Sequence, residues 1–235
     1  MKIVVLAGGL SPERNVSLST GTMVTEALRA LGHRAGLIDL YFGLETGGAD
    51  EAFFDAPVSE AYKKISREAP DLDQVRRGRK GDSPSMFGPG VLELCRMADM
   101  VFLALHGTCG EDGRVQAAFD LMGIPYTGAG YLGSAIAMDK DLTKRMVADV
   151  VSTPGWKTVA YTAADIDRLV ETARLPLVVK PVASGSSIGV SIAHTAEELR
   201  RSLTEGLALG GRTVLEEYIR GREIQVGILE DKALP

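Results

Sequence analysis

The sequence predicts an α/β protein that begins with a parallel sheet domain and continues into a second α+β domain. Two segments, at residues 3–7 and 99–105, are apolar throughout apart from Asp99 and have the composition of parallel strands that are buried on both faces. A helical pattern follows each run, and strand and helix patterns alternate over the first 40 residues. After residues 128–130, which we interpret as a domain boundary, the strands are interleaved with a different set of helices.

The composition is that of a globular protein and excludes several functional classes. With 235 residues and 45% hydrophobic content, the chain is long enough to bury a sizeable core. A net charge of −5 without a long basic run argues against nucleic-acid binding. Cys95 and Cys109 form neither a disulfide framework nor a zinc pattern. We find no signal peptide pattern and no apolar run near the roughly 20 residues of a membrane span, so we expect a cytoplasmic protein without a membrane partner.

The first 40 residues predict a βαβ unit. The strand at 3–7 ends at Gly8-Gly9, after which Ser11 is expected to be the helix N-cap and Pro12 the first helical residue. Gly32 is expected to end this helix, and a second strand is predicted at 34–40. The apolar face of the helix is predicted to consist of Val16, Met23, Ala27, Leu28 and Leu31.

Residues 41–90 lack a clear period, and we interpret them as an irregular insertion with one helix near 60–67. The basic residues at 76–80 are interpreted as a solvated surface loop, and an anion site is the less favoured alternative.

Regular patterns then resume and continue to the end of the chain. Helices are predicted at 91–97, 114–122, 131–150, 163–173 (capped by Thr162) and 195–207. Further strands are predicted at 125–127, 158–161, 177–181, 190–193 and 213–218, with a hairpin that begins at 223.

Three segments combine glycine-rich turns with residues that can do chemistry. Glu13 follows the turn at Gly8-Gly9, His106 follows the strand at 99–105, and Lys180 ends the strand at 177–181 and precedes a Gly/Ser loop at 184–189. Ligands collect beyond the carboxyl ends of parallel strands, where the first two segments lie. A lysine at the end of an apolar strand needs a partner, and a phosphate held by loop N–H groups is a natural one. Each segment also has a purely structural interpretation: Glu13 favours the helix dipole, His106 is a loop histidine, and the Gly/Ser loop is a hairpin turn.

Five segments occur in the order found in D-alanine–D-alanine ligases, and the chain resembles that family of the ATP-grasp superfamily. They are residues 8–17, 105–113, 125–128, 137–140 and 179–189. The resemblance implies a Rossmann-like (pre-ATP-grasp) N-terminal domain over 1–130, with 41–90 as its insertion. It also implies a central ATP-grasp lobe over 131–213 and, at 214–235, the start of a C-terminal lobe that remains incomplete.

The resemblance implies an activity in which ATP phosphorylates the carboxylate of one D-alanine. The amine of a second D-alanine then attacks the acyl phosphate and gives the D-alanyl-D-alanine dipeptide used in peptidoglycan. By similarity, Glu13 binds the ammonium group of the first substrate and His106 binds a substrate carboxylate. Ser186 is implied to bond towards Glu13, so that Glu13 and Ser186 are the catalytic candidates.

The same resemblance implies an ATP site and a magnesium requirement. Glu216 is expected to accept the adenine amino group, Ile219 to offer its backbone, and Glu223 to bind the ribose. The full ATP-binding set is Lys140, Lys180, Ser186, Ser187, Glu216, Glu217, Ile219 and Glu223. The family's magnesium ligands would lie beyond Pro235, so residues 1–235 contain no expected metal ligand and are expected to be inactive alone. A homodimer through the N-terminal domain is also implied.

Two alternatives stay open on the sequence. A ligase of the same fold can use D-lactate or D-serine as its second substrate, and a truncated chain can act as an inactive nucleotide-binding or assembly module. A dinucleotide-dependent oxidoreductase is disfavoured because residues 6–10 lack the G-x-G-x-x-G pattern.

Overall fold

The structure is a computed structural model that describes residues 1–44, 48–64, 69–183, 185, 187–230 and 232–234. The chain forms two compact units: Met1–Thr143 with Ala183–Gly185, and Lys144–Val182 with Ser186–Pro235. The domain limits that the family resemblance implies stay predictions.

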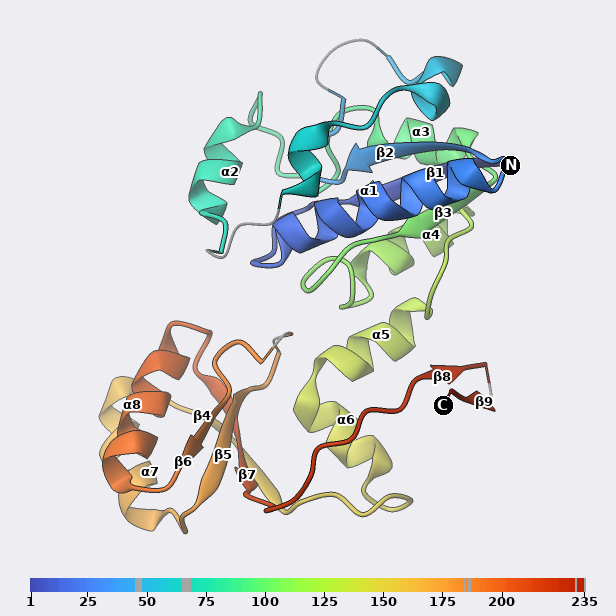
Figure 1. Ribbon diagram of the computed structural model, residues 1–235. Coiled ribbons are helices and arrows are strands. Elements are labelled where there is room, and N and C mark those ends of the chain that lie inside the picture. The colour runs from blue at the N-terminus through green and yellow to red at the C-terminus, as the bar shows by residue number, and fades with distance from the viewer. Residues whose placement is uncertain (45–47, 65–68, 184, 186, 231, 235) are drawn as a thin grey trace. The chain divides into compact units, whose positions relative to one another are not determined.

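The first unit is built on the predicted parallel sheet (Figure 1). Its strands lie in the order β2-β1-β3, and both neighbours of β1 run parallel to it. Val4 at the centre of β1 is opposite Gly36 on one side and Val101 on the other. The strands are β1 (Lys2–Ala7), β2 (Arg34–Asp39) and β3 (Met100–Leu103). This sheet confirms the predicted fold class.

Helices cover both faces of this sheet, because alternate residues of β1 point to opposite sides. Val4 and Leu6 pack into a core with α3 and α4, whereas Ile3 and Val5 pack into a second core with α1. The helices of the first unit are α1 (Arg14–Ala30), α2 (Leu72–Gly78), α3 (Val91–Met97), α4 (Arg114–Met122) and α5 (Tyr131–Met138).

The helix predicted at 131–150 is two helices, because Asp139 interrupts it. The Oδ1 atom of Asp139 accepts the N–H groups of Asp141 and Leu142 at 3.0 and 2.9 Å, as an N-cap does. A second helix, α6 (Lys140–Val147), therefore begins where α5 ends. The predicted strand at 125–127 is reduced to a single bridge between Val101 and Tyr126.

Two predictions for α1 are wrong. The helix begins at Arg14, because the Ser11 hydroxyl donates to the carbonyl of His106 and does not cap the helix. Of the predicted apolar face, only Leu28 is half-buried, and the other four residues are exposed. The buried side of α1 is made mainly of small and hydroxyl side chains, which let the helix approach the sheet closely: Ser17, Leu18, Ser19, Gly21, Thr22 and Thr25.

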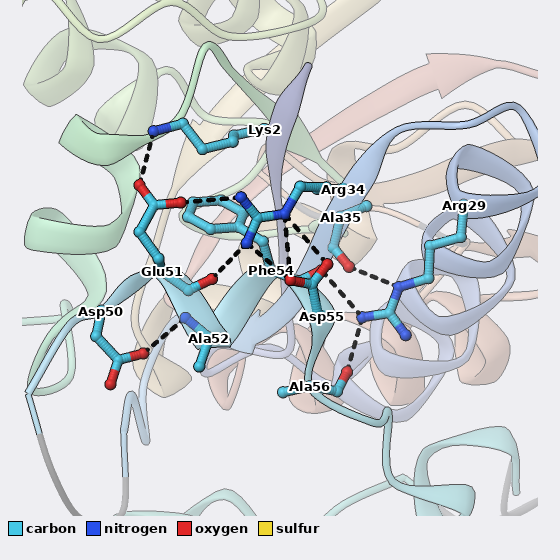
Figure 2. Close-up of polar contacts among 10 residues, drawn as sticks. All are labelled: Lys2, Arg29, Arg34, Ala35, Asp50, Glu51, Ala52, Phe54, Asp55 and Ala56. Carbon is cyan, nitrogen blue, oxygen red and sulfur yellow. Dashed lines mark hydrogen bonds and ion pairs between the residues drawn. The ribbon is translucent and has the colours of Figure 1, made fainter.

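The insertion at 41–90 contributes to the core of the first unit. Its first turn is the 3₁₀ helix Glu51–Asp55, whose Phe54 is fully buried. Figure 2 shows how this turn is fastened to β2, with Arg34 bonded to Glu51 and Asp55. The Arg34 hydrogen bond lowers the pKa of the Asp55 carboxyl. The predicted helix near 60–67 is the 3₁₀ turn Glu60–Lys63 as far as the structure describes it.

The basic cluster at 76–80 lies at the end of α2 and just after it, and one member, Arg79, has a structural role. Its guanidinium donates to the carbonyl oxygens of Ser85 and Phe87 and stacks over the ring of Tyr41.

The second unit contains a four-stranded antiparallel sheet in the order β4-β7-β5-β6. Val159, Val179 and Leu215 of this sheet pack with α7 and α8 in one core. Its main elements are β4 (Trp156–Ala160), the 3₁₀ turn Ala163–Asp165, α7 (Ile166–Thr172), β5 (Leu177–Pro181), β6 (Ser191–Ala193), α8 (Ala196–Leu207) and β7 (Arg212–Glu217).

The cap predicted at Thr162 is found in place, whereas Thr195, predicted as the first helical residue, is the N-cap of the next helix. The predicted terminal hairpin is formed by β8 (Ile228–Leu229) and β9 (Lys232–Ala233). Thr162 caps the turn before α7, and Thr195 caps α8 through a reciprocal pair with Glu198. Over the described residues of both units, every helix is too short or too polar to cross a membrane.

Candidate functional site

Glu13 and the turn after β3 lie together at the carboxyl edge of the parallel sheet. The Ser11 hydroxyl joins them, because it accepts the N–H of Glu13 at 3.2 Å and donates to the carbonyl of His106 at 2.8 Å. Gly107 has a φ of 68°, and a Cβ atom there would lie 2.8 Å from Oε2 of Glu13. Glycine is therefore required at this position both for its backbone conformation and for the close approach of the Glu13 carboxylate.

The side chain of His106 is half-buried and points to α1. Its Nε2 atom lies 3.3 Å from the hydroxyl of Thr20, within hydrogen-bond distance. Glu111 supports the same turn, since its Oε2 accepts the N–H of Gly107 at 2.9 Å. Glu111 lies in the glycine-rich segment 105–113 but was not among the predicted site residues. Its position four residues after Gly107 is the signal in the sequence that could have indicated it.

A buried ion pair supports the turn that precedes Glu13. Arg14 and Asp39 are 5% and 3% exposed and form a salt bridge. Arg14 also donates to the carbonyl of Gly9 at 2.8 Å, and Asp39 accepts the N–H groups of Tyr41 and Phe42. The pair thus ties the end of β1, the start of α1 and the end of β2 together.

Small-molecule sites commonly have volumes of about 300–1,000 Å³. The first unit has a cavity of about 630 Å³ beside this edge. Lys140, Glu111 and Gly185 are among the residues that line it. A Cβ atom on Gly185 would lie 3.1 Å from Oε2 of Glu13, so the Gly/Ser loop comes close to the carboxylate at this residue. Ser186, one of the two catalytic candidates, lies outside the described residues.

In the second unit, Lys180 and Glu216 meet on the face of the antiparallel sheet that lies opposite the α7 and α8 core. Glu216 pairs with Val178 and Lys180 pairs with Val214, which places the two charged side chains diagonally on one face. Lys180 Nζ donates to Oε1 of Glu216 at 2.6 Å. Lys144, which no sequence pattern singled out, forms an ion pair with Oε2 of the same carboxylate at 2.9 Å.

The two lysines control the ionisation of Glu216. Burial raises the pKa of this carboxyl, but hydrogen bonds and charge from Lys180 and Lys144 outweigh that effect, so its pKa lies below the usual value. The carboxylate is consequently ionised at neutral pH and acts only as a hydrogen-bond acceptor.

The other predicted nucleotide residues of this unit are on the surface. Glu217 is exposed, and its Oε2 lies 3.4 Å from the N–H of Gly155, which donates to it. Ser187 is exposed and has a φ of 57°. Ile219 and Glu223 follow β7 and are both exposed. Lys140 belongs to the first unit and Lys180 to the second.

This arrangement can bind charged small molecules. A carboxylate at the sheet edge suits an ammonium group, and lysines at strand and helix ends suit phosphate oxygens. The described residues contain no group of three or more His, Cys, Asp or Glu side chains that could hold a metal ion.

Family models match both parts of the chain. The model described as "D-ala D-ala ligase N-terminus" matches residues 2–129, and the one described as "D-ala D-ala ligase C-terminus" matches residues 149–235. The chain is 40% identical over 236 residues to the D-alanine–D-alanine ligase of Lacticaseibacillus casei, covering 99% of this chain and 65% of that relative. It is 41% identical to the Pediococcus pentosaceus ligase, covering 100% of this chain and 67% of the relative. The chain thus spans about two thirds of the length of these curated relatives.

Solved structures give the same result. The D-alanine–D-alanine ligase from Bacillus anthracis superposes with a TM-score of 0.67 at 29% identity, over 100% of this chain and 63% of that one. The same enzyme complexed with ATP superposes with a TM-score of 0.67 at 28% identity, over 100% of this chain and 64% of that one. The sequence matches and the shared fold agree with the order of motifs along the chain, and the chain belongs to the D-alanine–D-alanine ligase family.

Proposed function

We propose that this chain provides the substrate and nucleotide sites of an ATP-dependent carboxylate–amine ligase that joins two D-alanine molecules for peptidoglycan. The first carboxylate is phosphorylated by ATP, and the second amine displaces phosphate from the acyl phosphate, which gives the dipeptide, ADP and phosphate. Such catalysis depends on positioning and charge neutralisation. The observation that carries the proposal is the meeting of the Glu13 carboxylate with the turn at His106 and Gly107.

The proposed roles follow from charge and position. Glu13 binds the ammonium group of the first D-alanine, and His106 binds a substrate carboxylate. Ser186 is proposed to bond towards Glu13, and Lys140 is proposed to neutralise phosphate oxygens. The remaining nucleotide contacts are assigned to Lys180, Ser187, Glu216, Glu217, Ile219 and Glu223. We also propose that the ligase acts in the cytoplasm as a homodimer.

Calorimetric titration of ATP tests the nucleotide site. Lys180→Ala removes an ammonium group that is 27% exposed on its side chain, and we expect ATP affinity to fall about tenfold because a charge-assisted contact is lost. Lys157→Ala is the matched control, since Lys157 is an exposed lysine of β4 on the other face of the sheet. The affinity of this variant for ATP is expected to equal that of the wild-type protein. Equal affinities of the wild-type and Lys180→Ala proteins would remove Lys180 from the site.

Residues 1–235 on their own are expected to make no detectable dipeptide, even with excess magnesium. Metal ions that bridge phosphates supply several kcal/mol of transition-state stabilisation, and losing even about 5 kcal/mol slows a reaction more than a thousandfold. In the proposed enzyme the magnesium ligands belong to a segment that the family places after the position of Pro235. Purified residues 1–235 that release stoichiometric ADP and dipeptide from ATP and D-alanine would contradict this assignment.

A further inference from the structure

We propose that Lys144 is a positioning residue for base recognition: it holds the Glu216 carboxylate in the orientation that accepts the 6-amino group of adenine and rejects a 6-oxo base. The inference rests on the proposed function, in which Glu216 meets the adenine. It adds a residue that neither the sequence motifs nor the proposed set of ligands includes.

Lys144 is placed to position a neighbour and has no donor left for a ligand. An ammonium group has three N–H donors, and three oxygen acceptors surround this one: the Thr153 hydroxyl, the Pro154 carbonyl at 3.1 Å and Glu216 Oε2 at 2.9 Å. The side chain is only 12% exposed, and its Nζ lies 4.8 Å from the centre of the Trp156 ring. Lys144 therefore anchors α6 to the sheet by way of Glu216.

Lys180 differs from Lys144 both in the number of oxygen acceptors around its ammonium group and in the exposure of its side chain. Within the part of the chain that the structure describes, the Lys180 ammonium contacts Oε1 of Glu216 alone, and its side chain is 27% exposed against 12% for Lys144. The two lysines thus bind one carboxylate oxygen each, and with respect to the described residues Lys180 keeps N–H groups for a nucleotide, whereas Lys144 does not. The carboxylate cannot rotate without breaking one of two ion pairs, so its remaining lone pairs point in fixed directions.

Fixed orientation and fixed charge together give base selectivity. An ionised carboxylate accepts a hydrogen bond from a 6-amino group, but it offers no donor to a 6-oxo group. A protonated carboxyl does offer a donor, so protonation would weaken the discrimination. The described charged groups that face Glu216 are Lys144 from α6 and Lys180 from β5, while β4 contributes the uncharged Trp156. Loss of Lys144 removes one of the two cations that keep the carboxyl ionised.

The test compares ATP with inosine triphosphate, which carries a 6-oxo base, by calorimetric titration of the 235-residue chain. Lys144→Met is expected to lower ATP affinity roughly tenfold and inosine triphosphate affinity less than about twofold, so that the preference for ATP almost disappears. Lys144→Arg keeps the charge and the stacking on Trp156 and is expected to retain most of the preference. Lys157→Met is the control for loss of a lysine from the same sheet, and it should leave both affinities unchanged.

A pH series separates positioning from a merely structural role. The wild-type ratio of ATP to inosine triphosphate affinity should be constant between about pH 5 and 8, because the pKa of Glu216 lies below its usual value. In Lys144→Met that pKa rises, so the ratio should fall as the pH is lowered. Circular dichroism of each variant checks that the second unit remains folded.

The outcomes show whether the role of Lys144 alone is wrong or the proposed nucleotide site is wrong as well. If the wild-type protein prefers ATP and Glu216→Gln abolishes the preference while Lys144→Met retains it at every pH, Lys144 does not position Glu216 and the inference is wrong. If the wild-type protein binds neither nucleotide at millimolar concentration, or if Glu216→Gln changes nothing, the proposed nucleotide site is wrong and the inference is wrong with it.

Discussion

The buried pair of Arg14 and Asp39 is the single contact on which the stability of the first unit should depend most. Removing one partner leaves the other charge buried and unpaired, which destabilises proteins by about 3–5 kcal/mol. We expect Arg14→Met to lower the free energy of unfolding of the first unit by that amount in urea titration. Arg34→Met is the control, because its pairs with Glu51 and Asp55 are exposed and screened by solvent, so their loss should change the free energy of unfolding much less. Similar losses for both variants would show that burial of the Arg14 pair has no special effect.

Sequence patterns identified the candidate residues whose own segment indicates their chemistry. They missed residues whose possible role depends on a contact with a residue far away in the chain. Glu13 and His106 follow strand ends and Lys180 lies near the end of β5, so a local pattern was sufficient to select them. Lys144 becomes notable only through Glu216, which is 72 positions later in the chain. Its position four residues after Lys140 on one helix was the only local indication. The roles of all these residues stay predictions.

Helix α1 shows why the predicted elements were more reliable than the predicted packing. The pattern located the helix and its end at Gly32, but it assigned the buried face to large apolar residues. The sheet instead requires small side chains there, because Ser17 bonds across to the carbonyl of Ala104 at 2.7 Å and to the N–H of Gly8 at 2.8 Å. Hydroxyls of this kind are satisfied only by the tertiary fold, which a hydrophobic period cannot anticipate.

Two helical glycines give opposite predictions for the same substitution. A Cβ atom on Gly21 of α1 would lie 2.5 Å from Leu37 and 2.8 Å from Ala7, whereas one on Gly133 of α5 would meet nothing within 4 Å. We expect Gly21→Ala to destabilise the first unit by about 1–3 kcal/mol through overpacking. Gly133→Ala should stabilise it by up to about 1 kcal/mol, because alanine is the better helix former. Urea titration of both variants measures the difference, and a stabilising Gly21→Ala would show that α1 can move away from the sheet.

The two compact units have separate sheets and separate hydrophobic cores. Among the described residues, the core clusters of the first unit involve strands β1 to β3 and their helices, and that of the second unit involves β4 to β7 with α7 and α8. Elements unfold cooperatively when they bury their side chains in the same core. A unit whose core shares no residue with that of its neighbour can therefore unfold separately. We therefore expect two unfolding transitions.

Trp156, the one tryptophan of the chain, belongs to the second unit and makes this prediction measurable. Its fluorescence should follow only the second unit during urea titration, whereas far-ultraviolet circular dichroism should follow both, so the two curves should not coincide. Arg14→Met should shift the circular dichroism curve and leave the fluorescence midpoint unchanged. Thr195→Ala, which removes the N-cap of α8, should lower the fluorescence midpoint through a loss of about 1 kcal/mol. Coincident curves that shift together in both variants would mean that the units unfold as one cooperative body, and the separation of their cores would then have no thermodynamic consequence.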